Sequence, residues 1–546
     1  MASILLRSRA LLAGALLAAG VAFLPSPAVA QRAGRGDRPT SAPSETAAPE
    51  AAPAAPDQRT GRRGRGAPGG LTTAPTADAV DETPIITHHT IEVDGKTIKY
   101  TATCAQMPLK TATGETEAHI FYTAYTLDDS DHDKRPLTFA FNGGPGAASI
   151  WVHMGAMGPK RAKMEDDGNM PRPPFKLVDN DQTWLNFTDL VFIDPVGTGY
   201  SRAKSTDVAR RMNGVQGDLQ SVSEFIRMYV NRNDRFLSPM FIAGESYGTF
   251  RAAGLAGTLL GQGYAVNGIV LISTILNYGV VRATESNSTA YALLLPTFTA
   301  DAWYHHKLSD ALQKDLPTAL KESEKWAMGG YLDALNKGDQ LTKEERDAAI
   351  KTTARLTGLS EKYVDESDMR IDVGHFTREL LRDKRLTIGR YDGRITGPSP
   401  MDAGEAAEGD PSDAAVKSPF TTTFLHYLRS DLKWQSDETY YALGGGIMPW
   451  DFGRPNNYAE TTNLLQSAFT GNAYMKVLVC ASRFDLATPY FSAQYTLNHM
   501  GIHPDRQKDI TWKYYESGHM MYIEKKSRAK LHSDVQEFIE ANSPKE

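Results

Sequence analysis

A serine flanked by glycines is the first group in this sequence whose type and spacing can do chemistry. Gly244, Ser246 and Gly248 form the pattern Gly-x-Ser-x-Gly within FIAGESYGTF. A buried strand pattern at 239–243 precedes the serine and a helical pattern follows it. Strand, tight turn and helix in this order form a nucleophile elbow, which exposes a hydroxyl for attack on a carbonyl carbon. A serine that only caps a helix is the alternative interpretation.

A serine hydroxyl at neutral pH needs a base that takes its proton and an acid that orients the base. Around a nucleophile elbow these groups follow in the order Ser, Asp, His. Asp485 follows the strand pattern VLVCAS, and His519 follows the next one, in WKYYESGHMM. We predict that Asp485 and His519 serve Ser246. Two alternatives stay open: Asp485 only accepts hydrogen bonds from turn amides, or His499 or His503 is the base.

Attack on a carbonyl creates an oxyanion, which needs N–H donors already in place. The backbone amide of Tyr247, directly after the serine, is one predicted donor. A second is expected from the loop NGGPG at 142–146, which follows the early strand pattern LTFAF. Glycines there allow the backbone to approach a substrate closely. A simple tight turn is the alternative reading of this loop.

The elements that position these groups alternate between short apolar runs and helical patterns. Strands interleaved with helices predict an α/β protein with a mostly parallel central sheet flanked by helices, the α/β-hydrolase fold. The sheet is expected to begin with a hairpin that turns at Asp94 and Gly95. We assign its first part to 85–281 and its second part to 436–546.

Residues 282–435 lose the strand pattern and predict a helical cap insertion over the site. Thr342 and Glu345 fit a capping box at the start of one of its helices. The cluster Trp303-Tyr304-His305-His306 also lies in this range. A packed helix face is the favoured reading of that cluster, and a pocket lining is the alternative.

The first residues follow the pattern of a secretory signal peptide, which we assign to 1–30. Arg7 and Arg9 precede the apolar run LLAGALLAAGVAFL, which is short for a membrane span, and AVA at 28–30 fits a cleavage site. No cysteine follows the run, so no lipid anchor is expected there. A retained membrane anchor is the alternative. We expect an exported protein, periplasmic or secreted, without stable membrane insertion after cleavage.

Residues 31–84 are rich in Ala, Pro, Gly, Arg and Thr and contain few large apolar side chains. Such a composition cannot bury enough apolar surface to offset its conformational entropy, so we predict a disordered linker. A solvated spacer is favoured over contact of its arginines with anionic polymers or membranes.

The composition excludes several function classes. The chain has 546 residues, a net charge of −6 and a pI near 6.1, so no global field favours nucleic acid. No Gly-rich phosphate loop is present, and acyl transfer through a serine needs no metal or cofactor, so we expect none. The two cysteines, Cys104 and Cys480, leave the redox compartment open, and a buried thiol is favoured for Cys480.

Several motifs in the same order resemble the serine carboxypeptidase family. They are FNGGPGAAS with a following Gly-Pro, then FIDPVGTGYS, GESYG, RFD and SGHM, across residues 138–521. The resemblance implies Ser246 as nucleophile, His519 as base and Asp485 as its orienting acid. It also implies that the amides of Gly144 and Tyr247 form the oxyanion hole.

In this family the residues at Asn142 and Glu245 bind the terminal carboxylate of a peptide. Two carboxylates can meet only if they share a proton, so such binding should strengthen in acid. A Glu245 with no substrate role is the alternative. Ala140 and Ala156 stand where the family commonly has a tryptophan and a glutamate of the same network.

The resemblance implies an exported serine-type carboxypeptidase acting on peptides with a free C-terminus through an acyl-enzyme. An esterase or acyltransferase with the same triad is the first alternative, because an ester needs no terminal carboxylate. A non-catalytic binding protein on the same fold is the second.

Overall fold

The structure is a computed structural model that describes residues 80–401, 403–453 and 456–544. The predicted signal peptide, 1–30, and the predicted linker as far as residue 79 lie outside the described residues. All of the elements below belong to one compact unit of the chain.

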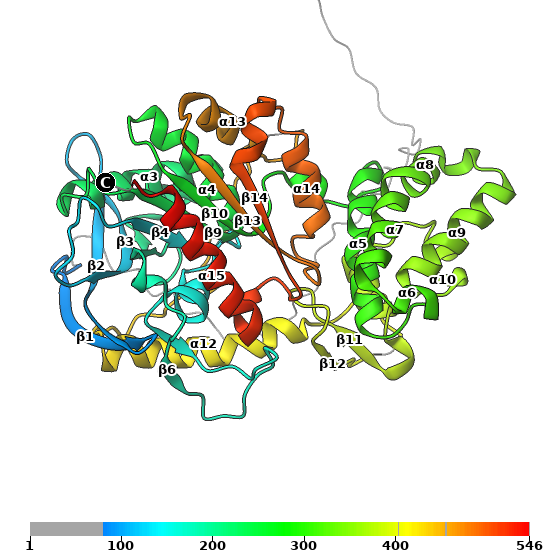
Figure 1. Ribbon diagram of the computed structural model, residues 1–546, viewed down its shortest axis with the longest axis horizontal. Helices are drawn as coiled ribbons and strands as arrows, with labels where there is room; N and C mark the ends of the chain where they lie inside the picture. The colour runs from blue at the N-terminus through cyan, green and yellow to red at the C-terminus, as the bar shows by residue number, and fades with distance from the viewer. Residues whose placement is uncertain (1–79, 402, 454–455, 545–546) are drawn as a thin grey trace, which may run out of the picture. The chain divides into compact units, whose positions relative to one another are not determined.

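One large sheet runs through the protein (Figure 1). Its strand order is β1-β2-β3-β7-β4-β9-β10-β13-β14, with the short β8 paired to β3. The first pairs, from β1 to β7, are antiparallel, and every pair from β7 to β14 is parallel. The predicted fold class, a mostly parallel α/β-hydrolase sheet flanked by helices, is confirmed. The strands are β1 (Ile85–Val93), β2 (Lys96–Lys110), β3 (Thr116–Leu127), β4 (Leu137–Phe141), β7 (Asp189–Ile193), β8 (Arg202–Ala203), β9 (Met240–Ser246), β10 (Gly268–Thr274), β13 (Lys476–Ser482) and β14 (Ile510–Tyr515).

Alternate residues of the central strands point into two separate cores. In β9, Phe241 and Ala243 belong to the core on one side of the sheet, whereas Ile242 between them belongs to the other. The first core is covered by α12 (Pro411–Ser430) and α15 (Lys525–Asn542), and the second by α3 (Val215–Arg232), α4 (Tyr247–Gly261) and α13 (Thr462–Gly471). Because both faces are covered, these strands are apolar at nearly every position.

The predicted hairpin at the start of the sheet is confirmed. β1 and β2 pair antiparallel from Val93 and Lys96 outward, and the turn between them has Asp94 at φ 50° and Gly95 at φ 72°. Both cysteines are buried free thiols: Cys104 lies in β2 and Cys480 in β13. Burial raises the pKa of each thiol to about 12, which fits inert core residues.

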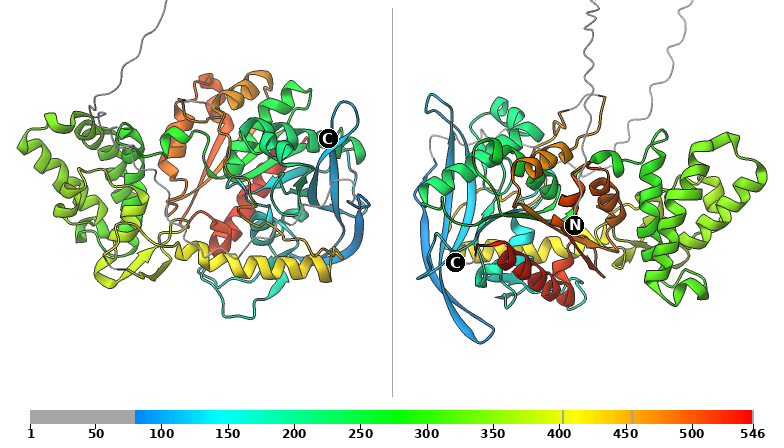
Figure 2. Two further views of the ribbon diagram at one scale, coloured as in Figure 1. Left: turned by 180° about the vertical axis from the view of Figure 1, so that it is seen from behind. Right: turned by 45° about the horizontal axis from the view of Figure 1, so that its top comes forward.

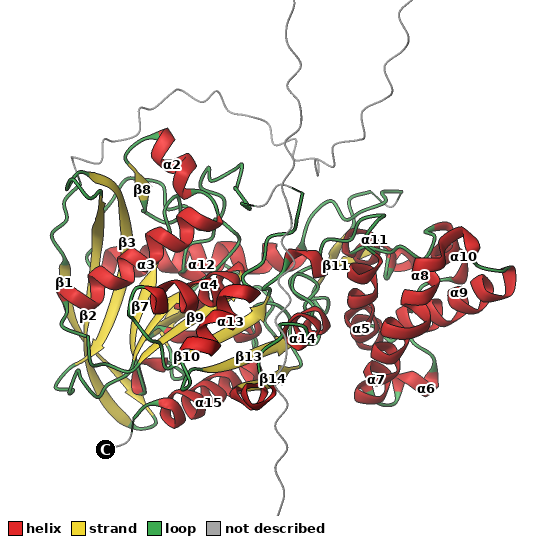
Figure 3. Cartoon of the chain, turned by 90° about the horizontal axis from the view of Figure 1, so that it is seen from above, coloured by secondary structure: helices red, strands yellow, loops and turns green. Residues whose placement is uncertain are grey.

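A group of helices between β10 and β13 has its own apolar core, in which the rings of Phe298 and Phe376 stack with centroids 3.9 Å apart. We call residues 288–398 the helical insertion. Figures 1 and 3 show its first helix beside α14 (Tyr490–Asn498). Its elements are α5 (Ser288–Tyr304), α6 (Asp310–Gln313), α7 (Leu316–Trp326), α8 (Leu332–Lys337), α9 (Lys343–Thr357), α10 (Glu361–Glu366), α11 (Val373–Glu379), β11 (Leu386–Ile388) and β12 (Thr396–Pro398).

The capping box predicted for this region is present at the start of α9, where Thr342 and Glu345 each bond the other's backbone amide. Helix α12 falls inside the range 282–435 that we predicted for the cap, but only its first residues contact the helical insertion, at β11, β12 and Tyr391. It packs along the sheet domain (Figure 2), against β5 (Lys160–Ala162) and β6 (Leu177–Asp179). The remaining short helices are α1 (Ile150–Val152) and α2 (Thr206–Met212). In the residues that the structure describes, no helix is long and apolar enough to cross a membrane.

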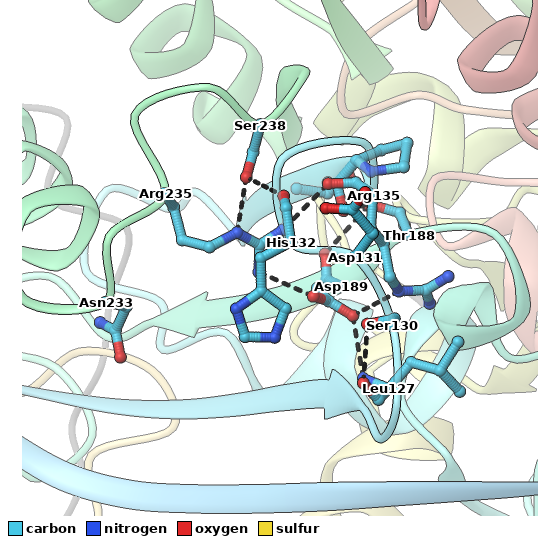
Figure 4. A network of polar contacts seen from close by, with 12 residues as sticks. Leu127, Ser130, Asp131, His132, Arg135, Thr188, Asp189, Asn233, Arg235 and Ser238 are labelled. Atoms are coloured by element: carbon cyan, nitrogen blue, oxygen red, sulfur yellow. Dashed lines mark hydrogen bonds and ion pairs between the residues drawn. The ribbon is translucent and has the colours of Figure 1, made fainter. Parts of the chain in front are cut away.

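A buried ion-pair network joins the amino ends of the parallel strands (Figure 4). Asp189, the first residue of β7, is fully buried and accepts hydrogen bonds from Arg135 at 2.6 Å and Arg235 at 2.7 Å. Arg235 also donates to Ser238 at 2.6 Å, and Ser238 donates to the carbonyl of His132 at 2.6 Å. Because buried charges are tolerated only when paired, this network fixes the loops before β4, β7 and β9.

Candidate active site

Ser246 occupies the sharp turn between β9 and α4. Its φ is 60° and its ψ is −130°, a conformation that L-residues rarely adopt and that is typical of a nucleophile elbow. The two flanking glycines make the turn possible. A Cβ at Gly244 would lie 2.1 Å from the carbonyl oxygen of Gly248, and a Cβ at Gly248 would lie 2.9 Å from that of Phe141. The turn therefore requires glycine at both positions.

His519 and Asp485 form a buried hydrogen-bonded pair. The Nδ1 atom of His519 lies 2.9 Å from Oδ2 of Asp485, and both side chains are almost fully buried. The other oxygen, Oδ1, accepts the turn amides of Ala487 at 2.8 Å and Thr488 at 2.9 Å. Asp485 thus does both things that we considered: it holds its own turn and it orients the imidazole.

The two other histidines considered as the base lie away from the serine. His499 is exposed at the end of α14, where its Nδ1 contacts the carbonyl of Tyr495. His503 is 72% exposed before β14 and caps a short helical turn. Neither is among the residues that line the cleft around Ser246.

One cleft contains Ser246, His519, Glu245 and Gly144. His519 presents Nε2 to this cleft, where it lies 3.5 Å from Oε1 of Glu245. Among the described residues, no hydrogen bond joins the Ser246 hydroxyl to His519. Such bonds commonly tighten only when a substrate is bound, so the arrangement is compatible with proton transfer from the serine to the imidazole.

Glu245 is a buried carboxyl group with one satisfied oxygen. Oε2 accepts a hydrogen bond from Asn142 at 2.7 Å, and Asn142 in turn accepts the amide of Val152 at 3.0 Å. Oε1 is buried and has no hydrogen-bond partner among the described residues. Burial raises the pKa of Glu245, and the charge of Asp485 adds to this effect, whereas His519 and Asn142 oppose it. Glu245 is therefore easier to protonate than an exposed glutamate.

The pKa of His519 is shifted upward as well. Burial disfavours the imidazolium, but the carboxylates of Asp485 and Glu245 outweigh burial and raise the pKa above the usual value for histidine. A base of this kind accepts a proton readily from a nucleophile that it can reach.

The loop predicted to supply an oxyanion donor lies directly against the start of α4. A Cβ on Gly143 would be 2.3 Å from the backbone nitrogen of Tyr247. Gly144 follows with φ 99°, a conformation that favours glycine, and lines the cleft. The predicted donors, the amides of Gly144 and Tyr247, therefore come from two adjacent backbone segments.

A second segment holds this loop from the other side. Ala148 donates its amide to the carbonyl of Ala442 at 3.1 Å, and Gly444 donates to that of Gly146 at 3.0 Å. Leu443, between them, lines the cleft beside Gly144. The loop is thus hydrogen-bonded in place before any substrate arrives, as oxyanion stabilisation requires.

Sequence reasoning missed the contribution of residues 389–395, which join β11 to β12. Arg390 and Tyr391 line the cleft, as does Asp413 at the start of α12. The ring of Tyr391 stacks on that of His519, with centroids 5.2 Å apart and planes inclined by 13°. The carbonyl of Tyr391 also accepts the His519 amide at 2.5 Å. No local motif marks these residues, because the contact depends on how the insertion folds.

The aromatic and histidine cluster at the end of α5 packs against neighbouring residues and does not line the cleft. Trp303 donates its indole N–H to the carbonyl of Gln313 at 2.9 Å, and Tyr304 packs edge-on against Phe484. The His305 ring lies 2.7 Å from the carbonyl of Gly393 and so supports segment 389–395. The favoured reading, a packed helix face, matches these contacts.

The two departures from the family pattern are small buried residues. Ala140 is 0% exposed in β4 and Ala156 is 1% exposed in the turn after α1. Neither can donate or accept a side-chain hydrogen bond, so the network around Glu245 is reduced to Asn142. Within the described residues, no group of three or more His, Cys, Asp or Glu side chains is placed to hold a metal ion.

Comparison with known proteins yields one extended match. The family model described as serine carboxypeptidase matches residues 109–537. Serine carboxypeptidase-like 17 of Arabidopsis thaliana is 30% identical over 139 residues, 24% of this chain and 30% of that protein. The pheromone-processing carboxypeptidase KEX1 of Saccharomyces cerevisiae is 33% identical over 135 residues, 23% of this chain and 17% of that protein. The chain thus aligns with less than a third of the length of these relatives.

Solved structures with a similar chain course include proline iminopeptidase of Mycobacterium smegmatis. It is 12% identical, has a TM-score of 0.35, and the match covers 80% of this chain and 99% of that one. No conclusion about activity follows from this similarity.

Proposed function

Because the chain belongs to the serine carboxypeptidase family, we propose that it is an exported serine-type carboxypeptidase that releases C-terminal residues from peptides. The observation that carries the proposal is the cleft in which Ser246, the Asp485-paired His519 and the carboxyl group of Glu245 meet. A nucleophile with a base serves any acyl transfer, whereas a buried carboxyl group with a raised pKa beside it suits a substrate that ends in a carboxylate.

In this mechanism His519 takes the hydroxyl proton of Ser246 at Nε2 while Oγ bonds to the scissile carbonyl carbon. The amides of Gly144 and Tyr247 stabilise the oxyanion that forms. The peptide C–N bond then breaks, and the imidazolium gives its proton to the leaving amine. Water, deprotonated by His519, hydrolyses the acyl-enzyme and regenerates Ser246. Asp485 keeps the imidazole oriented and stabilises its charged form.

The terminal carboxylate of the substrate is proposed to bind at Glu245 and Asn142. The buried Oε1 of Glu245, which has no hydrogen bond among the described residues, supports this role, because a protonated carboxyl group there can donate to a carboxylate. The raised pKa of Glu245 keeps that proton at higher pH than an exposed glutamate would. Binding is thus expected to be strongest in acid.

Export is part of the same proposal and rests on the predicted signal peptide at 1–30. The partner is a peptide with a free C-terminus, in a periplasm or outside the cell, and neither nucleic acid nor a membrane is required. Edman sequencing of the protein recovered from the producing cell tests this point, with a mature N-terminus near Gln31 as the expected result.

The decisive experiment compares an N-blocked dipeptide with its C-terminal amide, using the wild-type protein and Ser246→Ala. Cleavage of the free acid in preference to the amide, lost in Ser246→Ala, is the expected result. Mass spectrometry identifies the released amino acid.

An esterase or acyltransferase is the second candidate, and the loss of network partners at Ala140 and Ala156 favours it. Equal turnover of both dipeptides, or hydrolysis of simple esters alone, would replace the carboxypeptidase proposal with this one. A fluorophosphonate probe that fails to label the wild-type protein would leave only a binding protein on this fold.

A further inference from the structure

Segment 389–395 carries a cation into the cleft. Arg390 is the single lysine or arginine among the described residues that line the cleft, where Glu245 and Asp413 supply acidic groups. Its guanidinium makes no hydrogen bond or ion pair with any described residue. The guanidinium carbon lies over the ring of Tyr391, 5.5 Å from its centroid. A permanently charged group with free donors thus lines the same cleft as Ser246.

The backbone that carries this side chain is held on both sides. The Arg390 amide donates to Asp410 at 3.1 Å, and its carbonyl accepts the amide of Leu486 at 3.2 Å. The next residue, Tyr391, donates its amide to Ser412 at 3.0 Å and is bonded to His519 through its carbonyl. The guanidinium therefore starts from a fixed point relative to the catalytic base, and little backbone entropy is lost when it binds a ligand.

The charge balance of the network around Glu245 leaves a place for such a cation. In the part of the chain that the structure describes, Asn142 is the one side chain that hydrogen-bonds Glu245, and Ala140 and Ala156 contribute no polar group. Among the described residues that line this cleft, Arg390 and a protonated His519 are the positive groups that a substrate carboxylate would meet. Because an arginine fork matches a carboxylate in geometry and charge, it is the natural counterpart.

We propose that Arg390 binds a carboxylate at the C-terminal end of the substrate and favours substrates that carry this carboxylate free. The inference deepens the proposed function and rests on it for the identity of the scissile bond. The carboxylate has two possible sources: the terminal α-carboxylate, or the side chain of an acidic residue at the cleavage site. Both present the same group to the guanidinium, and the experiment separates them.

The test measures, within each variant, the ratio of kcat/KM between a free-acid substrate and its methyl ester. N-blocked dipeptides ending in Phe, Gln or Glu are the substrates for the wild-type protein, Arg390→Gln and Arg390→Lys. Loss of a charge-assisted hydrogen bond is expected to lower the ratio about tenfold or more in Arg390→Gln. Arg390→Lys should give an intermediate ratio, because it keeps the charge and loses the fork. Because the readout is a ratio of two values measured on the same variant, a misfolded fraction lowers both values equally and does not change the ratio.

The three chain ends identify the source. A lower ratio of acid to ester in Arg390→Gln for all three chain ends assigns Arg390 to the α-carboxylate. A fall in the preference for Glu over Gln alone assigns it to the acidic side chain. An unchanged ratio and an unchanged Glu-over-Gln preference, or equal loss on the acid and its ester, would overturn the proposal. Arg346→Gln is the matched control: this arginine of α9 pairs with Asp365 and Asp368 and does not line the cleft.

The same variants separate this inference from the proposed function. A depsipeptide, in which an ester replaces the scissile amide, is used with its terminal carboxylate free or methylated. If the wild-type protein cleaves no peptide, the carboxypeptidase proposal fails. The depsipeptide ratio then still reports on Arg390: a fall in Arg390→Gln supports the carboxylate contact, and no change overturns it.

Discussion

The ring of Tyr391 lies on the imidazole of His519, with the two centroids 5.2 Å apart and the planes inclined by 13°. Tyr391 comes from the end of the helical insertion, whereas His519 follows β14 in the sheet domain. The pair also shares a backbone hydrogen bond between the His519 amide and the Tyr391 carbonyl. The insertion therefore positions the imidazole of His519, the proposed base.

Replacing Tyr391 with leucine is expected to lower kcat about threefold to tenfold, because aromatic stacking contributes about 0.5–1.5 kcal/mol. Tyr391→Phe keeps the stack and should restore most of the rate. Steady-state kinetics with KM and kcat determined separately checks the prediction. A loss confined to KM in Tyr391→Leu would mean that the ring serves the substrate instead of the base.

Asp485→Asn tests the orientation of the imidazole. An amide cannot stabilise the imidazolium and can hold the wrong tautomer, so kcat should fall about 10³- to 10⁴-fold. Because Oδ1 of Asp485 also accepts two turn amides, asparagine can preserve that turn. The variant should therefore melt close to the wild-type temperature. A rate within tenfold of wild type would remove Asp485 from the mechanism.

The pH dependence should differ between KM and kcat. Glu245 has a raised pKa, so its proton is present at low pH and is lost as the pH rises through that value, and KM for a free-acid peptide should rise in parallel. His519 must be neutral to accept a proton, so kcat should fall as the pH drops through its own raised pKa. Glu245→Gln, which always carries a donor, should flatten the KM profile; an unaltered profile would contradict the role of Glu245.

Gly143→Ala probes the close approach of the oxyanion loop to α4. The new methyl group would lie 2.3 Å from the backbone nitrogen of Tyr247, so the loop must shift and kcat should fall at least about tenfold. Gly261→Ala is the control in the same helix, since a Cβ there meets nothing within 4 Å. It should leave kcat unchanged and should not lower the melting temperature.

Asp189→Asn separates stability from activity. The substitution leaves Arg135 and Arg235 buried with weakened pairing, and a broken buried ion pair typically costs about 3–5 kcal/mol of folding free energy. Because this network lies at the amino ends of the strands and Ser246 at the carboxyl end of β9, kcat of the folded fraction should be preserved. Urea unfolding measures the loss of folding free energy, and kinetics normalised by active-site titration give kcat of the folded fraction.

Local features of the fold could be predicted from sequence where a few adjacent residues determine them. The elbow at Ser246, the turn at Asp94 and Gly95 and the capping box at Thr342 each follow from a few adjacent residues. The pairing of Asp485 with His519 was inferred from chain order, and the structure brings these residues together with Ser246. The roles of Arg390 and Tyr391 could not be predicted from sequence, because their position in the cleft depends on packing between segments distant in the chain. The position of α12 against the sheet domain could not be predicted for the same reason.

The anchoring of segment 389–395 has a consequence for how proteins of this kind can be recombined. A graft that exchanged the whole of 288–398 for another sequence would remove the carbonyl partner and the aromatic face of the catalytic imidazole together with the helices. The helices before β11 share most of their core with one another, but α5 also packs on α14 and its His305 contacts the carbonyl of Gly393. Chimaeras should therefore keep 389–395 together with α5 from the recipient chain and exchange the helices beyond α5.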